Sequence, residues 1–197
     1  MINIEYLIDR VKLVIVNPKA AWEKISNEEI QLKDFLTSYI LPLVLIPTIA
    51  SFIGYGLIGM GSYFQVASFS WGLHQAILAF LGAFLGVLIS AFCIHKLAAS
   101  FHTHVSLPNA VKLVGYAYTP SWLAGVFYMV PSLSILGLVA GIYSLYILYL
   151  GFVPVTNVAE DKKTNYFVVS LIVVIAVSVL LSLVIGAVLL AIGLNTY

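Results

Sequence analysis

Charged side chains are scarce in this sequence. Only 9% of its 197 residues are Asp, Glu, Lys or Arg, against 62% that are hydrophobic, and the mean hydropathy is +1.08. A soluble domain usually carries about 25% charged residues, and a chain of this length has too little interior to bury so much apolar surface. The sequence therefore predicts an integral membrane protein. A net charge of +1 leaves no basic stripe for nucleic acid, so the lipid bilayer is the expected partner.

Cysteine is almost absent. The single cysteine, Cys93, lies in an apolar run and cannot form an internal disulfide. A cleavable signal pattern is also missing, because Glu5, Asp9, Arg10 and Lys12 interrupt the first apolar region. The apolar start of the chain is therefore not predicted to be a signal peptide.

The long hydrophobic runs contain no charge. A charge in a membrane core costs roughly 2.5–3.5 kcal/mol and usually marks a proton or ion path, so this absence argues against a carboxylate-coupled transporter and an aspartyl intramembrane protease. The sequence also lacks His-Glu-x-x-His, Gly-rich phosphate-loop and Gly-x-Ser-x-Gly motifs. His95, His102 and His104 cluster in one loop, without the thiolates or carboxylates of a convincing metal site. We expect no catalytic residue, metal or cofactor.

Residues 1–33 form the one region of mixed polarity. Six apolar residues recur there at helical spacing: Ile4, Leu7, Ile8, Val11, Val14 and Ile15. A helix of roughly 14 residues is too short to span a bilayer, so we expect it to lie on the cytoplasmic membrane surface. Asn17-Pro18 should end it and start a second short helix. A solvated tail that only orients the protein is the alternative.

The remaining residues, 34–197, contain five uncharged runs, each near the ~20 residues that cross a bilayer core. They cover approximately 35–58, 73–94, 113–130, 133–155 and 167–194. The predicted fold class is therefore all-α: an integral membrane bundle of five transmembrane helices, preceded by a cytoplasmic amphipathic helix.

The basic residues predict the orientation of this bundle. All nine lie before the first run, between the second and third, or between the fourth and fifth: Arg10, Lys12, Lys19, Lys24, Lys33, Lys96, Lys112, Lys162 and Lys163. The eight acidic residues lie on the same side. Because Lys and Arg collect in cytoplasmic loops, the N terminus should be cytoplasmic and the C terminus should lie outside the cell.

Small residues spaced four apart predict close contacts between helices. Three such stripes occur: Gly82 with Gly86, Gly137 with Gly141, and Ser178 with Ser182 and Gly186. The contacts can lie within one chain or, in a homo-oligomer, between two copies. Prolines interrupt two spans, at Pro42, Pro47 and Pro120. Each one frees a carbonyl that lipid cannot satisfy, so these positions are either static kinks or hinges.

Tyrosines follow one another at i, i+3 and i+6 in the fourth run, at Tyr143, Tyr146 and Tyr149. This spacing predicts a stripe of hydroxyl groups on one helix. Buried tyrosine hydroxyls need partners, and the carbonyls freed by the span prolines are candidates. The stripe either fastens three helices together or lines a polar path for a neutral solute or cation.

Several short motifs occur in an order that resembles one known family. They are Asn17-Pro18-Lys19-Ala20-Ala21-Trp22, Ile46-Pro47 followed by Phe52-Ile53-Gly54, Gly115-Tyr116-Ala117-Tyr118-Thr119-Pro120, and Tyr146-Ile147-Leu148-Tyr149-Leu150-Gly151 ahead of Pro154. The third motif looks like the Gly-Tyr-x-x-x-Pro signature of the Yip (Ypt/Rab-interacting protein) family. The whole chain resembles the bacterial inner-membrane, YohC-like branch of that family.

The resemblance implies a five-span membrane protein and makes Gly115, Tyr116, Thr119 and Pro120 candidate functional residues. Eukaryotic members act in vesicle traffic and bind Rab-type GTPases through cytosolic regions, but their Asp-Leu-Tyr-Gly-Pro motif is absent here. We therefore expect a non-enzymatic inner-membrane protein that works through membrane organisation or through a protein partner at its cytoplasmic face. A small-solute or ion permease that uses the proline-kinked helices and the tyrosine stripe is the alternative.

Overall fold

The computed structural model describes residues 4–59 and 67–191, and in that part of the chain every regular element is helical. The α-helices are α1 (Ile4–Val16), α2 (Pro18–Ile25), α3 (Leu32–Phe35), α4 (Leu41–Ile53), α5 (Phe69–Leu97), α6 (Leu107–Ala117), α7 (Thr119–Ala124), α8 (Leu136–Thr156) and α9 (Glu160–Ala191). Two π-helical turns, η1 (Leu36–Ile40) and η2 (Gly54–Ile58), flank α4. Three 3-10 turns are η3 (Ala98–Phe101), η4 (Gly125–Met129) and η5 (Pro131–Leu133).

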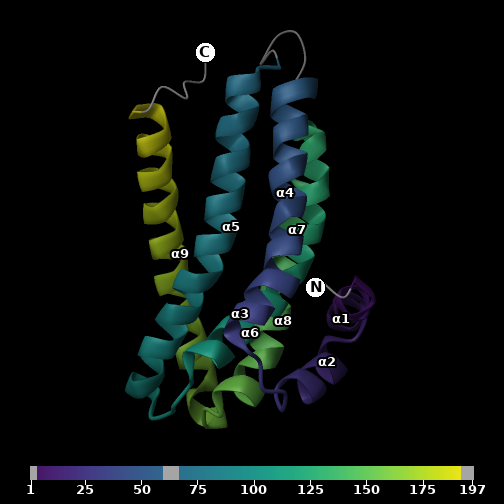
Figure 1. Ribbon diagram of the computed structural model, residues 1–197. Coiled ribbons are helices and arrows are strands. Elements are labelled where there is room, and N and C mark those ends of the chain that lie inside the picture. Colours follow the sequence, from purple (N-terminus) through teal and green to yellow (C-terminus); the bar gives the residue numbers. More distant parts are fainter. Residues whose placement is uncertain (1–3, 60–66, 192–197) are drawn as a thin grey trace.

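Four helical stretches of the described residues are long and apolar enough to cross a membrane: Leu32–Ile58, Phe69–Phe101, Leu136–Thr156 and Glu160–Leu189. They coincide with four of the five predicted spans. They stand side by side as an elongated bundle, with α4, α5 and α9 running most of its height (Figure 1). Residues 192–194 of the last predicted span, and the C terminus, lie outside the described residues.

The third predicted span, 113–130, is divided into shorter pieces. The α-helix stops at Tyr118, restarts as α7 and tightens into the 3-10 turn η4. Pro120 explains the break, because it lacks the N–H that would bond to the carbonyl of Tyr116. The pieces rise beside α4 (Figure 1) and pack against α4 and α8.

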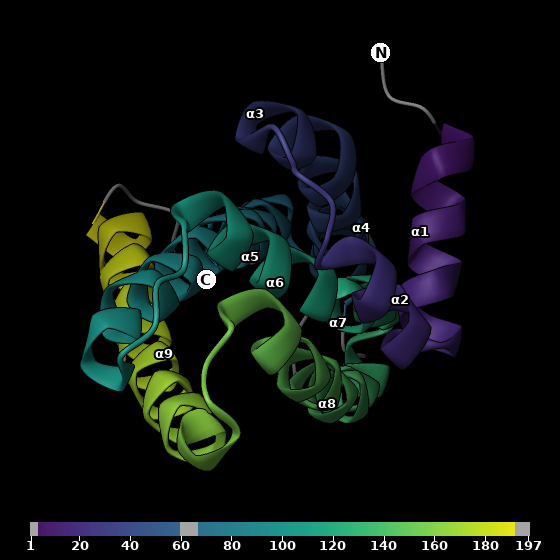
Figure 2. The same cartoon turned by 90° about the horizontal axis from the view of Figure 1, so that it is seen from below.

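The N-terminal segment breaks where the sequence predicts. Helix α1 ends at Val16 and α2 begins at Pro18, and the side chain of Asn17 caps α2 by accepting a hydrogen bond from the N–H of Ala20 (3.2 Å). Helix α1 lies crosswise to the bundle, since it is seen end-on in Figure 1 and lengthwise in Figure 2. It packs on α2 and α7, while α2 packs on α8.

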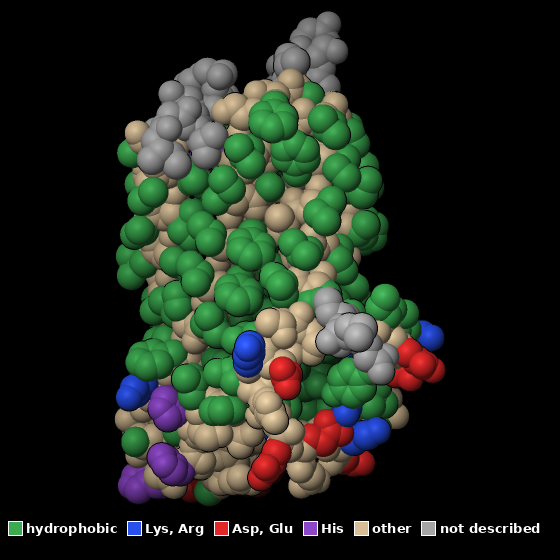
Figure 3. Space-filling view, in the orientation of Figure 1, with side chains coloured by type: hydrophobic (Ala, Val, Ile, Leu, Met, Phe, Trp, Pro, Cys, Tyr) green, Lys and Arg blue, Asp and Glu red, His purple; other side chains and the backbone are tan. Residues whose placement is uncertain are grey.

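The charged side chains gather at one end of the bundle (Figure 3). They come from α1 to α3, the last turn of α5, α6 and the first turns of α9. We call this the charged end. Above it the visible surface is almost entirely hydrophobic (Figure 3).

Four glycines of the predicted small-residue stripes make no close contact within the described part of the chain. A Cβ added at Gly82, Gly86, Gly141 or Gly186 would meet no described atom within 4 Å. Helices approach closely at other glycines. A Cβ on Gly72, for example, would come 2.4 Å from Cα of Gly56. Spacing alone identified small residues, but it did not identify which of them face a neighbouring helix.

Candidate functional site at the charged end

Tyr116 lies at the centre of an aromatic cluster. Its side chain is 1% exposed, and its ring centroid lies 4.6 Å from that of Tyr39 and 4.9 Å from that of Phe35. Trp22 packs edge-on against it at 6.3 Å. The neighbouring Gly115 makes room for Phe35, because a Cβ there would lie 2.8 Å from the Phe35 ring. We call Trp22, Phe35, Tyr39, Gly115 and Tyr116 the motif core.

Trp22 connects the motif core to α8. Its indole Nε1 donates a hydrogen bond to the carbonyl oxygen of Ile147 (2.9 Å). The ring lies directly on Gly151, where a Cβ would come 2.3 Å from a ring carbon. Only glycine allows this approach without movement of the ring. Two motifs that are far apart in the sequence therefore contact each other. One is the Asn-Pro-Lys-Ala-Ala-Trp segment, and the other is the Tyr-Leu-Gly segment.

Thr119 and Pro120 continue the motif core into the bundle. Thr119 is fully buried, and its hydroxyl shares a 2.9 Å hydrogen bond with the hydroxyl of Tyr39. Pro120 is also buried. One turn further along, Gly125 contacts Pro47 of α4, since a Cβ at position 125 would lie 2.5 Å from Cβ of Pro47. These contacts hold the broken α6–α7 segment against η1 and α4.

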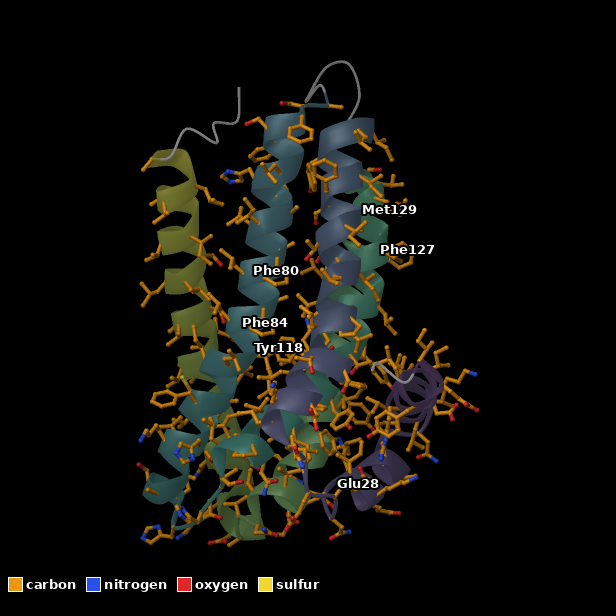
Figure 4. All side chains as sticks on the ribbon, viewed as in Figure 1. Glu28, Phe80, Phe84, Tyr118, Phe127 and Met129 are labelled. Atoms are coloured by element: carbon orange, nitrogen blue, oxygen red, sulfur yellow. The ribbon has the colours of Figure 1, made fainter. Side chains whose placement is uncertain are left out.

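Two buried cations hold the chain that follows α2: Arg10 binds it from α1, and Lys112 binds it from α6. Nη2 of Arg10 donates to both carboxylate oxygens of Glu28 at 2.6 Å. Glu28 appears beside α2 in Figure 4. Lys112 is also buried, with 1% of its surface exposed. Its Nζ donates hydrogen bonds to the backbone carbonyls of Ser26 (3.1 Å) and Glu28 (2.7 Å). Burial lowers the pKa of Lys112, while the nearby carboxylates of Glu28 and Glu29 act in the opposite direction.

A cavity of about 230 Å³ opens beside the motif core at the charged end. We call it the charged-end pocket; its lining residues are Tyr6, Glu29, Ile30, Gln31, Asp34, Phe35, Ser38, Tyr39 and Tyr116. The lining combines the faces and edges of four aromatic rings with two carboxylates. Carboxylates attract cations directly, and aromatic faces attract them through the ring quadrupole. The pocket is therefore suited to an ammonium or guanidinium group.

The structure brings together only part of the candidate residues. Gly115, Tyr116, Thr119 and Pro120 lie in or next to the motif core, and Pro47 reaches the same segment through Gly125. The sequence motifs contained Trp22 and Gly151 but gave no reason to rank them as site residues. Phe35, Tyr39, Glu29 and Asp34 carried no sequence signal at all, because their role depends on how α3 and η1 fold over α6.

The rings of Tyr143 and Tyr146 on α8 stack on each other, with their centroids 5.9 Å apart, but the three tyrosines have different partners. The hydroxyl of Tyr143 donates to the carbonyl of Ile15 in α1 (2.6 Å), and not to a carbonyl freed by a proline. Tyr146 is 45% exposed. Tyr149 is also exposed, with Nζ of Lys163 at 4.4 Å from its ring centroid. Each step of three residues falls about 60° short of a full turn, so Tyr149 lies about 120° around the helix from Tyr143 and contacts another neighbour.

Pro154 does not end helix α8. It lies inside α8, on the exposed side, and the helix continues to Thr156. The loop histidines also separate: Nδ1 of His95 lies 2.6 Å from the carbonyl oxygen of Val105, and Nδ1 of His102 lies 3.3 Å from Nζ of Lys162. No three His, Cys, Asp or Glu side chains of the described residues gather as metal ligands.

These observations define a class of protein: an all-helical, multi-pass membrane protein whose charged groups are collected at one end. The comparisons identify the family. Residues 12–183 match the model of the Yip1 domain, so the chain belongs to the Yip1 domain family. The resemblance inferred from the short motifs is thereby confirmed.

Two curated relatives are similar over most of the chain. Both are inner membrane protein YohC, one from Escherichia coli strain K12 and one from Escherichia coli O6:H1, and each is 27% identical over 175 residues. The alignment covers 85% of this chain and 89% of each relative. No solved structure matches the chain.

Proposed function

We propose that this protein is a five-span inner-membrane protein that binds a partner protein through the charged-end pocket. The role is binding, and it is not enzymatic. The observation that carries the proposal is that Tyr116, the tyrosine of the family signature, forms part of a pocket with two carboxylates at the charged end. A lysine or arginine side chain of the partner is the group that this chemistry recognises.

The membrane placement follows from the charges and from the relatives. Both curated relatives are named inner membrane proteins. With the basic residues in the cytoplasm, the charged end faces the cytoplasm, and α6, α7 and η4 together supply the third of five crossings. The N terminus is then cytoplasmic and the C terminus lies outside. The pocket consequently opens where soluble and membrane-bound cytoplasmic partners can reach it.

Helix α1 then rests on the cytoplasmic membrane surface. Its residues divide into three faces at 100° per residue. The face of Ile4, Ile8, Val11 and Ile15 is apolar, and Ile4 and Ile8 are 66% and 46% exposed. The face of Glu5, Asp9 and Lys12 is charged, and the face of Arg10 and Val14 is buried on the bundle. Apolar contact with lipid and charge toward water is the arrangement of an interfacial helix.

Photo-crosslinking in living cells tests the pocket. A photoreactive amino acid in place of Ser38, which lines the pocket, should form a discrete covalent adduct with one protein. The double substitution Glu29→Gln with Asp34→Asn should reduce the adduct at least fivefold, because it removes both carboxylates that attract the cation.

The matched control is Glu160→Gln with Asp161→Asn. This pair removes the same charge at the same end of the bundle but does not line the pocket. The adduct should persist in the control. Absence of an adduct at position 38, or equal losses in the two double variants, would contradict the proposed role of the pocket.

A further inference from the structure

A lipid-facing groove lies between α8 and α9, away from the charged-end pocket. Its volume is about 610 Å³, and its walls are Leu145 of α8, Tyr118, and the α9 residues Leu171, Val174, Ile175, Ser178, Val179, Ser182 and Leu183. A second cavity of about 340 Å³ continues from it along α8, past Gly137 and Gly141. Tyr118 and Leu145 line both cavities, so they form one groove. Figure 4 shows Tyr118 inside the bundle, well above the charged end.

The small residues of α8 and α9 create room in this groove. Gly141 on α8, and Ser178 and Ser182 on α9, line the two cavities. A Cβ on Gly141 would meet no described atom within 4 Å. Small residues normally let two helices touch, but here they leave space: Gly141 lies beside Tyr118 and Ser121 in one cavity, and Ser178 and Ser182 lie across from Leu145 in the other. The surrounding medium at this height is hydrocarbon, because the exposed side chains of both helices are aliphatic, including Ile142, Ile175 and Leu180.

An unpaired hydroxyl lies in a small cavity next to the groove. Ser170 is 3% exposed, and its Oγ has no hydrogen-bond partner in the described part of the chain. It lines a small inner cavity of about 10 Å³ that shares Tyr118, Leu171 and Val174 with the groove. That volume fits about one oxygen-sized probe. A buried hydroxyl without a partner is costly in an apolar medium, so an acceptor oxygen from outside the chain would stabilise it.

The dimensions favour a single hydrocarbon chain over a protein helix. The groove extends from Leu171 to Leu183 of α9, which is about 18 Å at 1.5 Å per residue. One leaflet of hydrocarbon is about 15 Å deep. A helix about 10 Å across would occupy roughly 1,400 Å³ over that length, more than the volumes of the two cavities combined. A methylene chain, which keeps about 4 Å from its neighbours, occupies roughly 300 Å³.

The depth of Ser170 fits an ester group. Ser170 lies seven residues beyond Lys163 on α9, or about 10 Å further into the membrane. The polar interfacial layer on each side of a bilayer is about 5–7 Å thick. With Lys163 among the headgroups, Ser170 lies just inside the hydrocarbon, next to the level of the glycerol esters.

We propose that this groove binds one acyl chain of a phospholipid from the leaflet at the charged end. The hydroxyl of Ser170 donates a hydrogen bond to the ester carbonyl oxygen, and the chain runs past Ser178 toward Leu183. The protein thereby holds one lipid in a fixed position between α8 and α9. This site is separate from the charged-end pocket and does not depend on its proposed partner.

The test uses the full-length protein in liposomes that contain a few per cent of a phospholipid with a photoactivatable diazirine in its acyl chain. After irradiation, peptide mass spectrometry locates the labelled residues. Groove residues such as Leu171 and Ile175 should be labelled severalfold more than Val184 and Val188, which are more than half exposed but do not line the groove.

Three variants make the test specific. Ser178→Leu fills the groove and should remove the enrichment, whereas Ala176→Leu adds the same side chain to the exposed side of α9 and should leave it unchanged. Ser170→Ala should lower the labelling yield severalfold without changing which residues are labelled.

Two outcomes overturn the proposal: labelling in proportion to exposure, or equal effects of Ser178→Leu and Ala176→Leu on the labelling. Each variant is first compared with the parent protein by thermal unfolding. If Ser178→Leu fails to fold, unchanged labelling of Ser170→Ala still refutes the site.

Discussion

The contact between Trp22 and Gly151 joins the N-terminal segment to the bundle, and it can be tested by a double-mutant cycle. The cycle compares the parent protein, Gly151→Ala, Trp22→Ala and the double variant. A methyl group at position 151 would lie 2.3 Å from the nearest ring carbon of Trp22. Carbon atoms in good contact lie about 3.5–4.0 Å apart, so the ring must move by more than about 1 Å.

The structure sets the expected free energies. Overpacking of this kind costs about 1–3 kcal/mol, whereas Gly→Ala inside a helix gains up to about 1 kcal/mol. Gly151→Ala should therefore destabilise the parent protein by about 1–2 kcal/mol. In the Trp22→Ala background the ring is gone, and the same substitution should be neutral or stabilising. The coupling energy should be about 1–3 kcal/mol.

Trp22→Ala should itself cost about 3–5 kcal/mol, as expected for a buried tryptophan. This substitution also removes the 2.9 Å hydrogen bond to the carbonyl of Ile147. Trp22→Phe should cost less than Trp22→Ala, because it keeps one aromatic ring. It removes the indole N–H, a bond worth about 1 kcal/mol, and part of the ring volume that lies on Gly151.

Reversible unfolding in mixed micelles, followed by circular dichroism, gives the four free energies. If the added methyl group meets the indole, Gly151→Ala must cost more when Trp22 is present than when it is absent. An equal cost with and without Trp22, with a coupling energy below about 0.5 kcal/mol, would refute the contact.

Three further predictions follow from other contacts. Tyr143→Phe removes the hydrogen bond to the carbonyl of Ile15, and it should destabilise α1 by about 1 kcal/mol and speed proteolysis at Val16–Asn17; an unchanged rate would contradict this. Alkaline phosphatase should be active when fused after Ala191 and inactive when fused after Lys163, because one crossing separates these positions; equal activities would refute five crossings. Proteoliposomes should release small solutes no faster than empty liposomes, and release that is lost in Tyr146→Phe would favour a permease.

The sequence located most of the helices because lipid imposes a simple rule. A run of about 20 uncharged residues must cross the hydrocarbon as a helix that satisfies its own backbone groups. Four predicted runs coincide with four long apolar helices. The break at Asn17-Pro18 was also predictable, since it depends on the covalent restriction that proline places on its own residue and on the one before.

The third run shows where this rule fails. Composition predicted one span over 113–130, but the chain divides it at Tyr118 and tightens it into η4. Pro120 was visible in the sequence, but how far the helix is broken depends on the residues that pack against it. Thr119 bonds to Tyr39, and Ser121 shares a 2.8 Å hydrogen bond with Ser144 of α8. Those partners stabilise a geometry that local propensity does not specify.

The candidate site was only partly predictable for a similar reason. Gly115, Tyr116, Thr119 and Pro120 stood out as a motif, because they are close together in the sequence. The partners of the three tyrosines on α8 were not predictable. A helical period indicates which side chains share a face, but it does not indicate which neighbours that face contacts. Trp22 and Gly151 are 129 positions apart, and their complementarity appears only when α2 packs on α8.

The sequence alone determined that this chain is a helical membrane protein. It also determined that the charged residues are separated from the apolar runs and that the chain belongs to a recognisable family. These properties depend on composition and on short local patterns, which act independently of how the helices pack. The tertiary structure alone decided which glycines touch a neighbour and which leave space. It also decided that Tyr116 lines one pocket together with the carboxylates of Glu29 and Asp34 and that Ser170 lies beside an apolar groove. Such relations are set by the packing of elements that are distant in the sequence, which no local pattern encodes.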